Sequence, residues 1–61
     1  MQINLNGEPY RLEAGATVAD LAVDQGSAVA VNGAVVPRGD HPARLLADGD
    51  MVEIVTAVQG G

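Results

Sequence analysis

The carboxyl end of the sequence carries the residues best suited to covalent chemistry. Its last two residues are Gly60 and Gly61, and a peptide end without side chains can enter a narrow channel and present its α-carboxylate to another enzyme. That carboxylate, with a reference pKa of about 3.3–3.7, is ionised near neutral pH. It can attack the α-phosphate of a bound nucleotide to form an acyl-adenylate. Displacement of the nucleotide by sulfide or a persulfide then gives a thiocarboxylate on Gly61.

Missing residue types favour the same reading. The 61 residues include no cysteine, and the three basic residues are Arg11, Arg38 and Arg44, so lysine is absent too. An activated tail would therefore meet only the α-amino group as an internal competitor. The same absences, with a single histidine, argue against a thiol nucleophile, a Schiff base or a multi-histidine metal site. We expect a chain that binds no cofactor or metal and is not an enzyme by itself.

Other polar residues have plainer interpretations. His41 lies before a proline in a predicted loop, and we expect it to be solvated. Asp48 and Asp50 flank a glycine, which is typical of a turn. A calcium site of the EF-hand kind would need more oxygen ligands at fixed spacing and a distant glutamate.

The net charge and the hydropathy pattern argue against some classes of binding partner. Eight acidic residues give a net charge of −5, which argues against nucleic acid or an anionic membrane as a partner. The acidity serves solubility in the plainer interpretation and steering toward a basic protein surface in the sharper one. No apolar run approaches the ~18–20 residues that cross a bilayer. We expect a cytoplasmic protein.

The elements that must position the tail begin with a hairpin. Residues 2–6 alternate polar and apolar side chains, with Ile3 and Leu5 on one face of a strand. Asn6-Gly7 is the preferred filling of a two-residue type I′ turn, so residues 8–13 should return antiparallel. Pro9, which lacks a backbone donor, suits an edge position in that return strand.

A short helix is predicted next. Thr17 and Asp20 match a helix start, and Gly26 matches the position just past a helix end. A helix of roughly eight residues between them is too short to be stable alone. It must therefore bury Val18, Leu21 and Ala22 against the hairpin.

The second half repeats the hairpin signal. An apolar run at 28–31 is followed by Asn32-Gly33 and a brief strand at 34–36 that Pro37 ends. Residues 38–47 are predicted to form a connecting segment, with Leu45 and Leu46 packed beneath it. From Met51 the pattern alternates again, which predicts a last strand through about residue 57.

The element order ββαβββ predicts an α+β fold of the β-grasp type. A right-handed crossover from the hairpin gives a mixed sheet of about five strands packed on one short helix, with the last strand parallel beside the first. The domain then spans residues 1–57. Residues 58–61 form a diglycine tail that we expect to be flexible.

The sequence resembles the ThiS family of sulfur carriers, members of the ubiquitin-like β-grasp superfamily. The resemblance covers the whole chain and rests on its length, on Asn32-Gly33 followed by 36–38 (Val-Pro-Arg), on the turn at 48–50 (Asp-Gly-Asp) before an apolar last strand, and on Gly60-Gly61. The motifs are unspecific singly and fairly specific in this order.

The resemblance implies a role in thiamine biosynthesis. A ThiF-like adenylyltransferase would use ATP to adenylate Gly61, while Gly60 keeps the approach unhindered. A desulfurase system would supply the sulfur, and a ThiG-like thiazole synthase would use it to form the thiazole. The carrier is then a recycled co-substrate. Gln59 departs from the small residue common at that position in the family.

Partner docking is predicted beside the tail. Val55 lies opposite Val52 and Ile54 in the alternating strand and should face outward, followed by Ala57, Val58 and Gln59. Packing inside the sheet is the alternative for Val55. Three other functions remain open: a carrier for molybdopterin or another thiolated metabolite, a noncovalent β-grasp interaction module, and ubiquitin-like modification of a target lysine.

Overall fold

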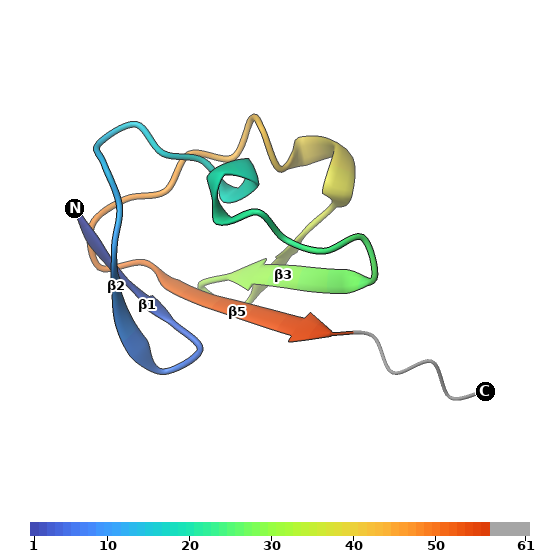
Figure 1. Cartoon of the computed structure of the whole chain (residues 1–61), viewed down its shortest axis with the longest axis horizontal. Helices are drawn as coiled ribbons and strands as arrows, with labels where there is room; N and C mark the ends of the chain where they lie inside the picture. The colour runs from blue at the N-terminus through green and yellow to red at the C-terminus, as the bar shows by residue number, and fades with distance from the viewer. Residues whose placement is uncertain (57–61) are drawn as a thin grey trace.

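Two hairpins flank a central last strand. The computed structural model describes residues 1–56, and its elements are listed here in chain order: β1 (Gln2–Leu5), β2 (Glu8–Arg11), the 3-10 turn η1 (Val18–Leu21), β3 (Ser27–Val31), β4 (Ala34–Val36), the 3-10 turn η2 (Arg38–Asp40) and β5 (Met51–Thr56) (Figure 1). The strands form one sheet in the order β2-β1-β5-β3-β4. β5 runs parallel to β1 and antiparallel to β3. The predicted five-stranded mixed sheet, with the last strand parallel beside the first, is confirmed.

Both Asn-Gly turns have the predicted backbone. Asn6 and Asn32 each have φ of 51°, and Gly7 and Gly33 each have φ of 86°. A type I′ turn needs positive φ at both central residues, and it matches the right-handed twist of the strands it joins. The hydrogen-bonded register of each hairpin follows from these turns.

A proline lies in or directly after each of the two edge strands of the sheet, β2 and β4. In the first hairpin Met1 and Leu12 exchange backbone hydrogen bonds of 2.7 and 2.9 Å. Hydrogen-bonded pairs alternate with non-bonded pairs in an antiparallel ladder, so Pro9, which is paired with Asn4, turns its nitrogen to the open edge. There its missing donor interrupts no ladder bond, which confirms the predicted edge position. Pro37 likewise follows β4 directly.

The predicted helix of about eight residues is wrong. Its place is taken by η1, a single 3-10 turn of four residues, and residues 1–56 contain no α-helix. Ala22 ends the turn in the left-handed region at φ 54°, and its N–H donates to the Ala19 carbonyl. One turn cannot repay the entropy of helix nucleation, so burial of Val18 holds it in place. The predicted start is confirmed, because Asp20 Oδ2 accepts the Thr17 N–H at 2.7 Å.

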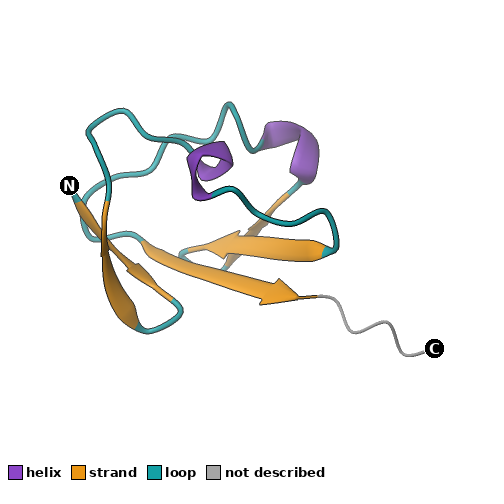
Figure 2. Cartoon of the chain, in the orientation of Figure 1, coloured by secondary structure: helices purple, strands orange, loops and turns teal. Residues whose placement is uncertain are grey.

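Figure 2 shows the connecting segments, with both helical turns, on one side of the sheet, and the core residues come from both layers. The buried apolar residues of the core come from four strands and two connections: Ile3, Val18, Val29, Val31, Val36, Leu46 and Val52. Ala22 is exposed, contrary to the prediction, because the turn ends before that position can face the sheet. In the part of the chain that the structure describes, neither helical turn is long or apolar enough to span a membrane.

The side chains of Leu45 and Leu46 differ in burial. Leu46 is 6% exposed, but Leu45 is 59% exposed and the prediction that it packs underneath is wrong. Leu45 forms an antiparallel β-bridge with Thr17, and consecutive side chains in extended backbone point to opposite sides. Only one of the two leucines can therefore reach the core.

Candidate functional site

β5 carries the chain toward the predicted reactive end. It is the central strand, and its antiparallel register with β3 runs from Val31↔Val52 to Ser27↔Thr56. Its pairing with β1 covers only Asn4↔Met51 and Leu5↔Val52. The strand is therefore held by β3 up to its last residue, Thr56. The predicted site residues Ala57, Val58, Gln59, Gly60 and Gly61 lie outside the described residues.

The asparagines of the two hairpin turns fix β5 from both sides. Asn32 Oδ1 accepts the Met51 N–H at 2.9 Å, and its backbone N–H donates to the Met51 carbonyl at 2.7 Å. Asn6 Oδ1 accepts the Ile54 N–H at 2.8 Å, and its N–H donates to the Val52 carbonyl at 2.9 Å. The sequence prediction gave these residues a turn role alone. The repeated choice of Asn rather than Gly, which has no side-chain acceptor, was the available signal.

The turn before β5 uses its carboxylates on backbone donors. Asp48 Oδ1 accepts the Gln2 N–H and Asp50 Oδ2 accepts the Ala47 N–H, at 2.7 and 2.8 Å. Asp50 Oδ1 accepts a further bond from Asn32 Nδ2 at 3.0 Å. The Ala47 and Asn32 bonds, with the positive charge of Arg44, hold the pKa of Asp50 below its usual value.

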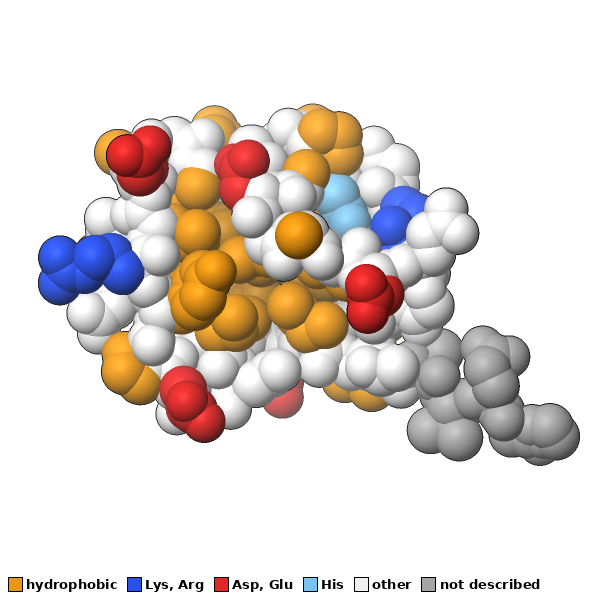
Figure 3. All heavy atoms as spheres, in the orientation of Figure 1, with side chains coloured by type: hydrophobic (Ala, Val, Ile, Leu, Met, Phe, Trp, Pro, Cys, Tyr) orange, Lys and Arg blue, Asp and Glu red, His pale blue; other side chains and the backbone are white. Residues whose placement is uncertain are grey.

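The predicted turn at 48–50 is thus confirmed. Asp48 and Asp50 use their oxygens to join the start of β5 to β1 and to the second hairpin. Within residues 1–56, no cluster of three His, Cys, Asp or Glu side chains could hold a metal ion. On the face drawn in Figure 3, acidic side chains are dispersed singly over the surface.

The outer face of β3, β4 and β5 carries small and apolar side chains around one carboxylate, that of Glu53. Val55, 62% exposed, is paired with Ala28, and Glu53 is paired with Ala30. Val35, 72% exposed, is the partner of Ala30 in β4. Side chains of directly paired residues lie on the same face, so these residues form one surface, which we call the outer patch (Ala28, Ala30, Val35, Glu53 and Val55). Val55 faces outward as predicted, and the alternative of packing inside the sheet is wrong.

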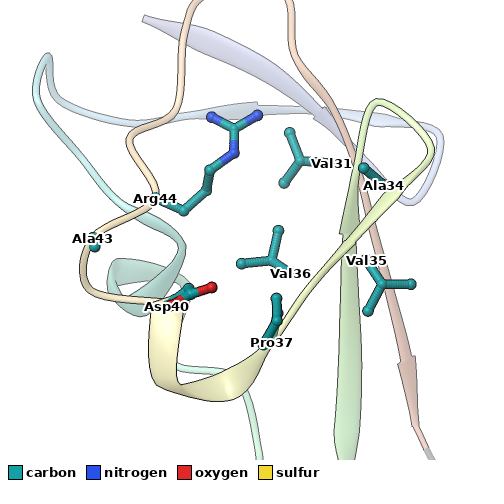
Figure 4. A pocket seen from close by; sticks show the side chains of 8 residues that line it. All are labelled: Val31, Ala34, Val35, Val36, Pro37, Asp40, Ala43 and Arg44. Atoms are coloured by element: carbon teal, nitrogen blue, oxygen red, sulfur yellow. The ribbon is translucent and has the colours of Figure 1, made fainter.

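A separate hollow of about 320 Å³ lies beside β4 (Figure 4). Val36 and Pro37 form part of its apolar lining, and Asp40 and Arg44 are its two charged residues. Figure 4 shows Val35 pointing away from this hollow, whereas Val36 points into it. Arg44 donates to the Leu45 carbonyl. The hollow lies at the edge of the second hairpin. Its lining residues include no nucleophilic side chain paired with a general base.

His41 is buried, so the prediction of a solvated loop residue is wrong. Its ring Nε2 lies 3.2 Å from the Val36 carbonyl, and its side chain is 6% exposed. Its backbone carbonyl accepts the Ala19 N–H at 3.1 Å, and its backbone N–H donates to the Arg38 carbonyl at 3.1 Å. The hydrogen bond between the ring nitrogen and the carbonyl of Val36, the last residue of β4, offsets the cost of burying a polar side chain. His41 therefore joins η1, η2 and β4.

Comparisons with known proteins agree with this geometry. The family model described as the ThiS family matches residues 3–61. A sulfur carrier protein ThiS of Escherichia coli K12 is 35% identical over an alignment of 66 positions that covers both chains in full. The crystal structure of a thiamine biosynthesis protein (ThiS) from Geobacter metallireducens superposes with a TM-score of 0.83 at 30% identity, again over both whole chains.

One relative is much longer. A thiazole synthase of Magnetococcus marinus is 46% identical over 66 aligned positions, which take in all of this chain but only 20% of that protein. The present chain therefore spans about a fifth of the length of this relative.

Proposed function

The chain belongs to the ThiS family, and we propose on that premise that it is a sulfur carrier of thiamine biosynthesis. The observation that supports this most is the family match over residues 3–61, which includes Gly60-Gly61 at its end. In this role the chain is a protein co-substrate and other enzymes carry out the chemistry. The β-grasp body, residues 1–57, offers a surface for those enzymes, and residues 58–61 form the tail that they act on.

The reaction begins at the Gly61 carboxylate. A ThiF-like adenylyltransferase binds ATP, and a carboxylate oxygen attacks its α-phosphate, so that pyrophosphate leaves and an acyl-adenylate forms. A desulfurase system supplies sulfur as a persulfide or sulfide, which attacks the acyl carbon and displaces AMP. Reductive cleavage by a second thiol frees the thiocarboxylate when the donor is a persulfide. ATP is bound by the partner, and the carrier itself holds no cofactor.

The composition of the chain suits this chemistry. With no lysine and no cysteine in its 61 residues, the activated acyl carbon meets no side-chain amine or thiol of its own chain. Gly60 adds no side chain beside the reacting carbon, so the tail can fit a narrow active-site channel.

A ThiG-like thiazole synthase is the proposed sulfur acceptor. The match of the whole chain to a fifth of a thiazole synthase supports this pairing, because it places a similar sequence in one polypeptide with that activity. We propose that Val55 of the outer patch contacts the partners, followed by Ala57, Val58 and Gln59. An exposed valine next to small alanines gives a shallow apolar surface for docking.

Intact-mass spectrometry tests the proposal. After incubation with the ThiF-like adenylyltransferase of the same organism, ATP and a desulfurase system, we expect a species heavier by about 16 Da, the difference between sulfur and oxygen at the acyl carbon. A chain synthesised with an amidated Gly61 is the matched control and should stay at its starting mass. Absence of the heavier species from the free-carboxylate chain would contradict the proposal. A conjugate to a target lysine would instead indicate protein modification.

A further inference from the structure

The strand that leads to the tail is paired on one side only over its second half. β5 keeps its register with β3 to Thr56, but β1 accompanies it no further than Val52. Figure 1 shows the β1–β2 hairpin ending beside the middle of β5, while the strand continues beyond it. The half of β5 from Ile54 to Thr56 therefore has an open flank on the side of β1.

The backbone groups on that flank follow from the ladder. The Asn32 N–H donates to the Met51 carbonyl, so the odd-numbered residues of β5 bond to β3 in the alternating antiparallel pattern. The even-numbered residues turn their N–H and C=O groups the other way. Two bonds confirm this, because the Val52 carbonyl and the Ile54 N–H are both bound by Asn6.

Asn6 thus acts as the last pairing residue on this side. Its amide oxygen satisfies the Ile54 N–H at 2.8 Å, as a neighbouring strand would. Beyond it, the Ile54 carbonyl and both backbone groups of Thr56 point to the open flank. Within residues 1–56, no hydrogen bond from β1 or its turn reaches them.

The two outer edges of the sheet contrast with this flank. β2 places Pro9, which has no donor, toward its open side, and β4 is three residues long and is followed by Pro37. Prolines and short strands are the usual means of preventing pairing with another chain. The open flank of β5 has no such protection in the part of the chain described.

We propose that an extended segment of the adenylating partner pairs with β5 at Ile54–Thr56 by backbone hydrogen bonds. The partner strand occupies the place in the sheet that β1 leaves empty beyond Asn6. This inference rests on the proposed function, since the partner is the enzyme that acts on the tail following Thr56. Backbone pairing directly before the tail fixes both its position and its direction, which added strands do without demanding particular side chains.

The surroundings suit a strand. The exposed Val55 and the half-buried Ile54 flank the open backbone groups on the two faces, so an incoming strand would gain apolar cross-strand contacts of the kind that stabilise sheets. The one charged residue of β5 is the exposed Glu53, which favours a basic side chain in the partner segment.

Amide hydrogen exchange of the ¹⁵N-labelled chain tests the proposal, with the ThiF-like adenylyltransferase as the probe. Binding should slow exchange at Thr56 at least about tenfold, the effect of one net hydrogen bond of roughly 1.4 kcal/mol. The Val55 amide, already bonded to β3, should change less. Unchanged Thr56 exchange in a complex that adenylates Gly61 would overturn this inference and leave the proposed function standing. Failure of adenylation would overturn both.

A pair of variants gives a second measurement. Thr56→Pro removes the outward N–H without removing a bond to β3, whereas Thr56→Ala removes only the side chain. Thr56→Pro should weaken binding to the adenylyltransferase about tenfold, while Thr56→Ala should bind as the parent does. Equal affinities for the two variants would overturn the proposal. If Thr56→Pro does not fold, the exchange measurement on the unaltered chain decides.

Discussion

The two hairpins share a turn and differ in what they do for β5. Both contain an Asn-Gly type I′ turn, and both asparagines bind the β5 backbone. The second hairpin runs beside β5 over five residue pairs and buries Val29, Val31 and Val36. The first hairpin pairs with β5 at two positions, and its outer strand β2 is exposed throughout. One hairpin closes the core, and the other leaves half of β5 accessible.

The same type I′ turn therefore occurs in two hairpins with different structural roles. A type I′ turn sets only the register of its own two strands. The length of β5 that each hairpin covers depends on where the chain returns, and the turn at 48–50 decides that by binding Gln2 and Asn32 together. Matched substitutions in the two hairpins should therefore have unequal effects.

The largest effect is expected in the second hairpin's core. Val31→Ala removes two buried methyl groups at about 0.8 kcal/mol each, and the cavity left behind adds to the loss. We expect the free energy of unfolding to fall by about 2–3 kcal/mol. Val35→Ala, the matched substitution on the outer face of β4, should change it by less than about 0.5 kcal/mol. Urea denaturation measures both, and equal losses would contradict the assignment of the core.

A smaller effect should separate the two turn asparagines. Asn32→Asp loses the donor to Asp50 and sets two carboxylates side by side, so we expect a loss of about 1–2 kcal/mol. Asn6→Asp keeps the acceptor for the Ile54 N–H and should stay within about 0.5 kcal/mol of the parent. Thermal denaturation of the two variants provides the comparison. The double variant Asn32→Asp with Asp50→Asn, which restores a donor, should recover part of the loss.

The smallest effect is a dependence of stability on pH. The pKa of Asp50 is lowered in the folded chain from an ordinary value of 3.8. Its carboxylate therefore adds stability that is fully present above pH 3.8 and is lost as the pH falls through the folded value. Asp50→Asn should therefore lose less stability than the parent as the pH falls below 3.8. Urea denaturation of the parent and the variant at a series of pH values measures this difference, and equal acid-induced losses would contradict the role of Asp50.

The sequence predicted the sheet well because its signals are local. Asn6-Gly7 and Asn32-Gly33 set both hairpins, and alternation of apolar residues placed Ile3 and Val52 inside. The helix failed because Thr17 and Asp20 announce a start but say nothing about length, and Ala22 in the left-handed region ends it after one turn. Propensity is a weak guide for a segment that tertiary packing holds in place.

Long-range contacts explain the other misses. His41 is buried because the Val36 carbonyl lies within reach of its ring, and no spacing in the sequence indicates that contact. Of the predicted site, Val55 lies where it was expected on the outer face. The roles of Gly60, Gly61 and the docking residues stay predictions, since they concern partners and lie, except for Val55, beyond residue 56.

The strand order has a consequence for synthesis of the chain. Among the strands of residues 1–56, β5 is the last in chain order, yet it stands between the two hairpins, which do not pair with each other there. A nascent chain that ends before residue 51 lacks the strand that joins the two hairpins, and each isolated hairpin is only marginally stable in water. Closure of the sheet must therefore wait until residues 51–56 leave the ribosome. A truncated translation product would lack a folded body for any partner to bind.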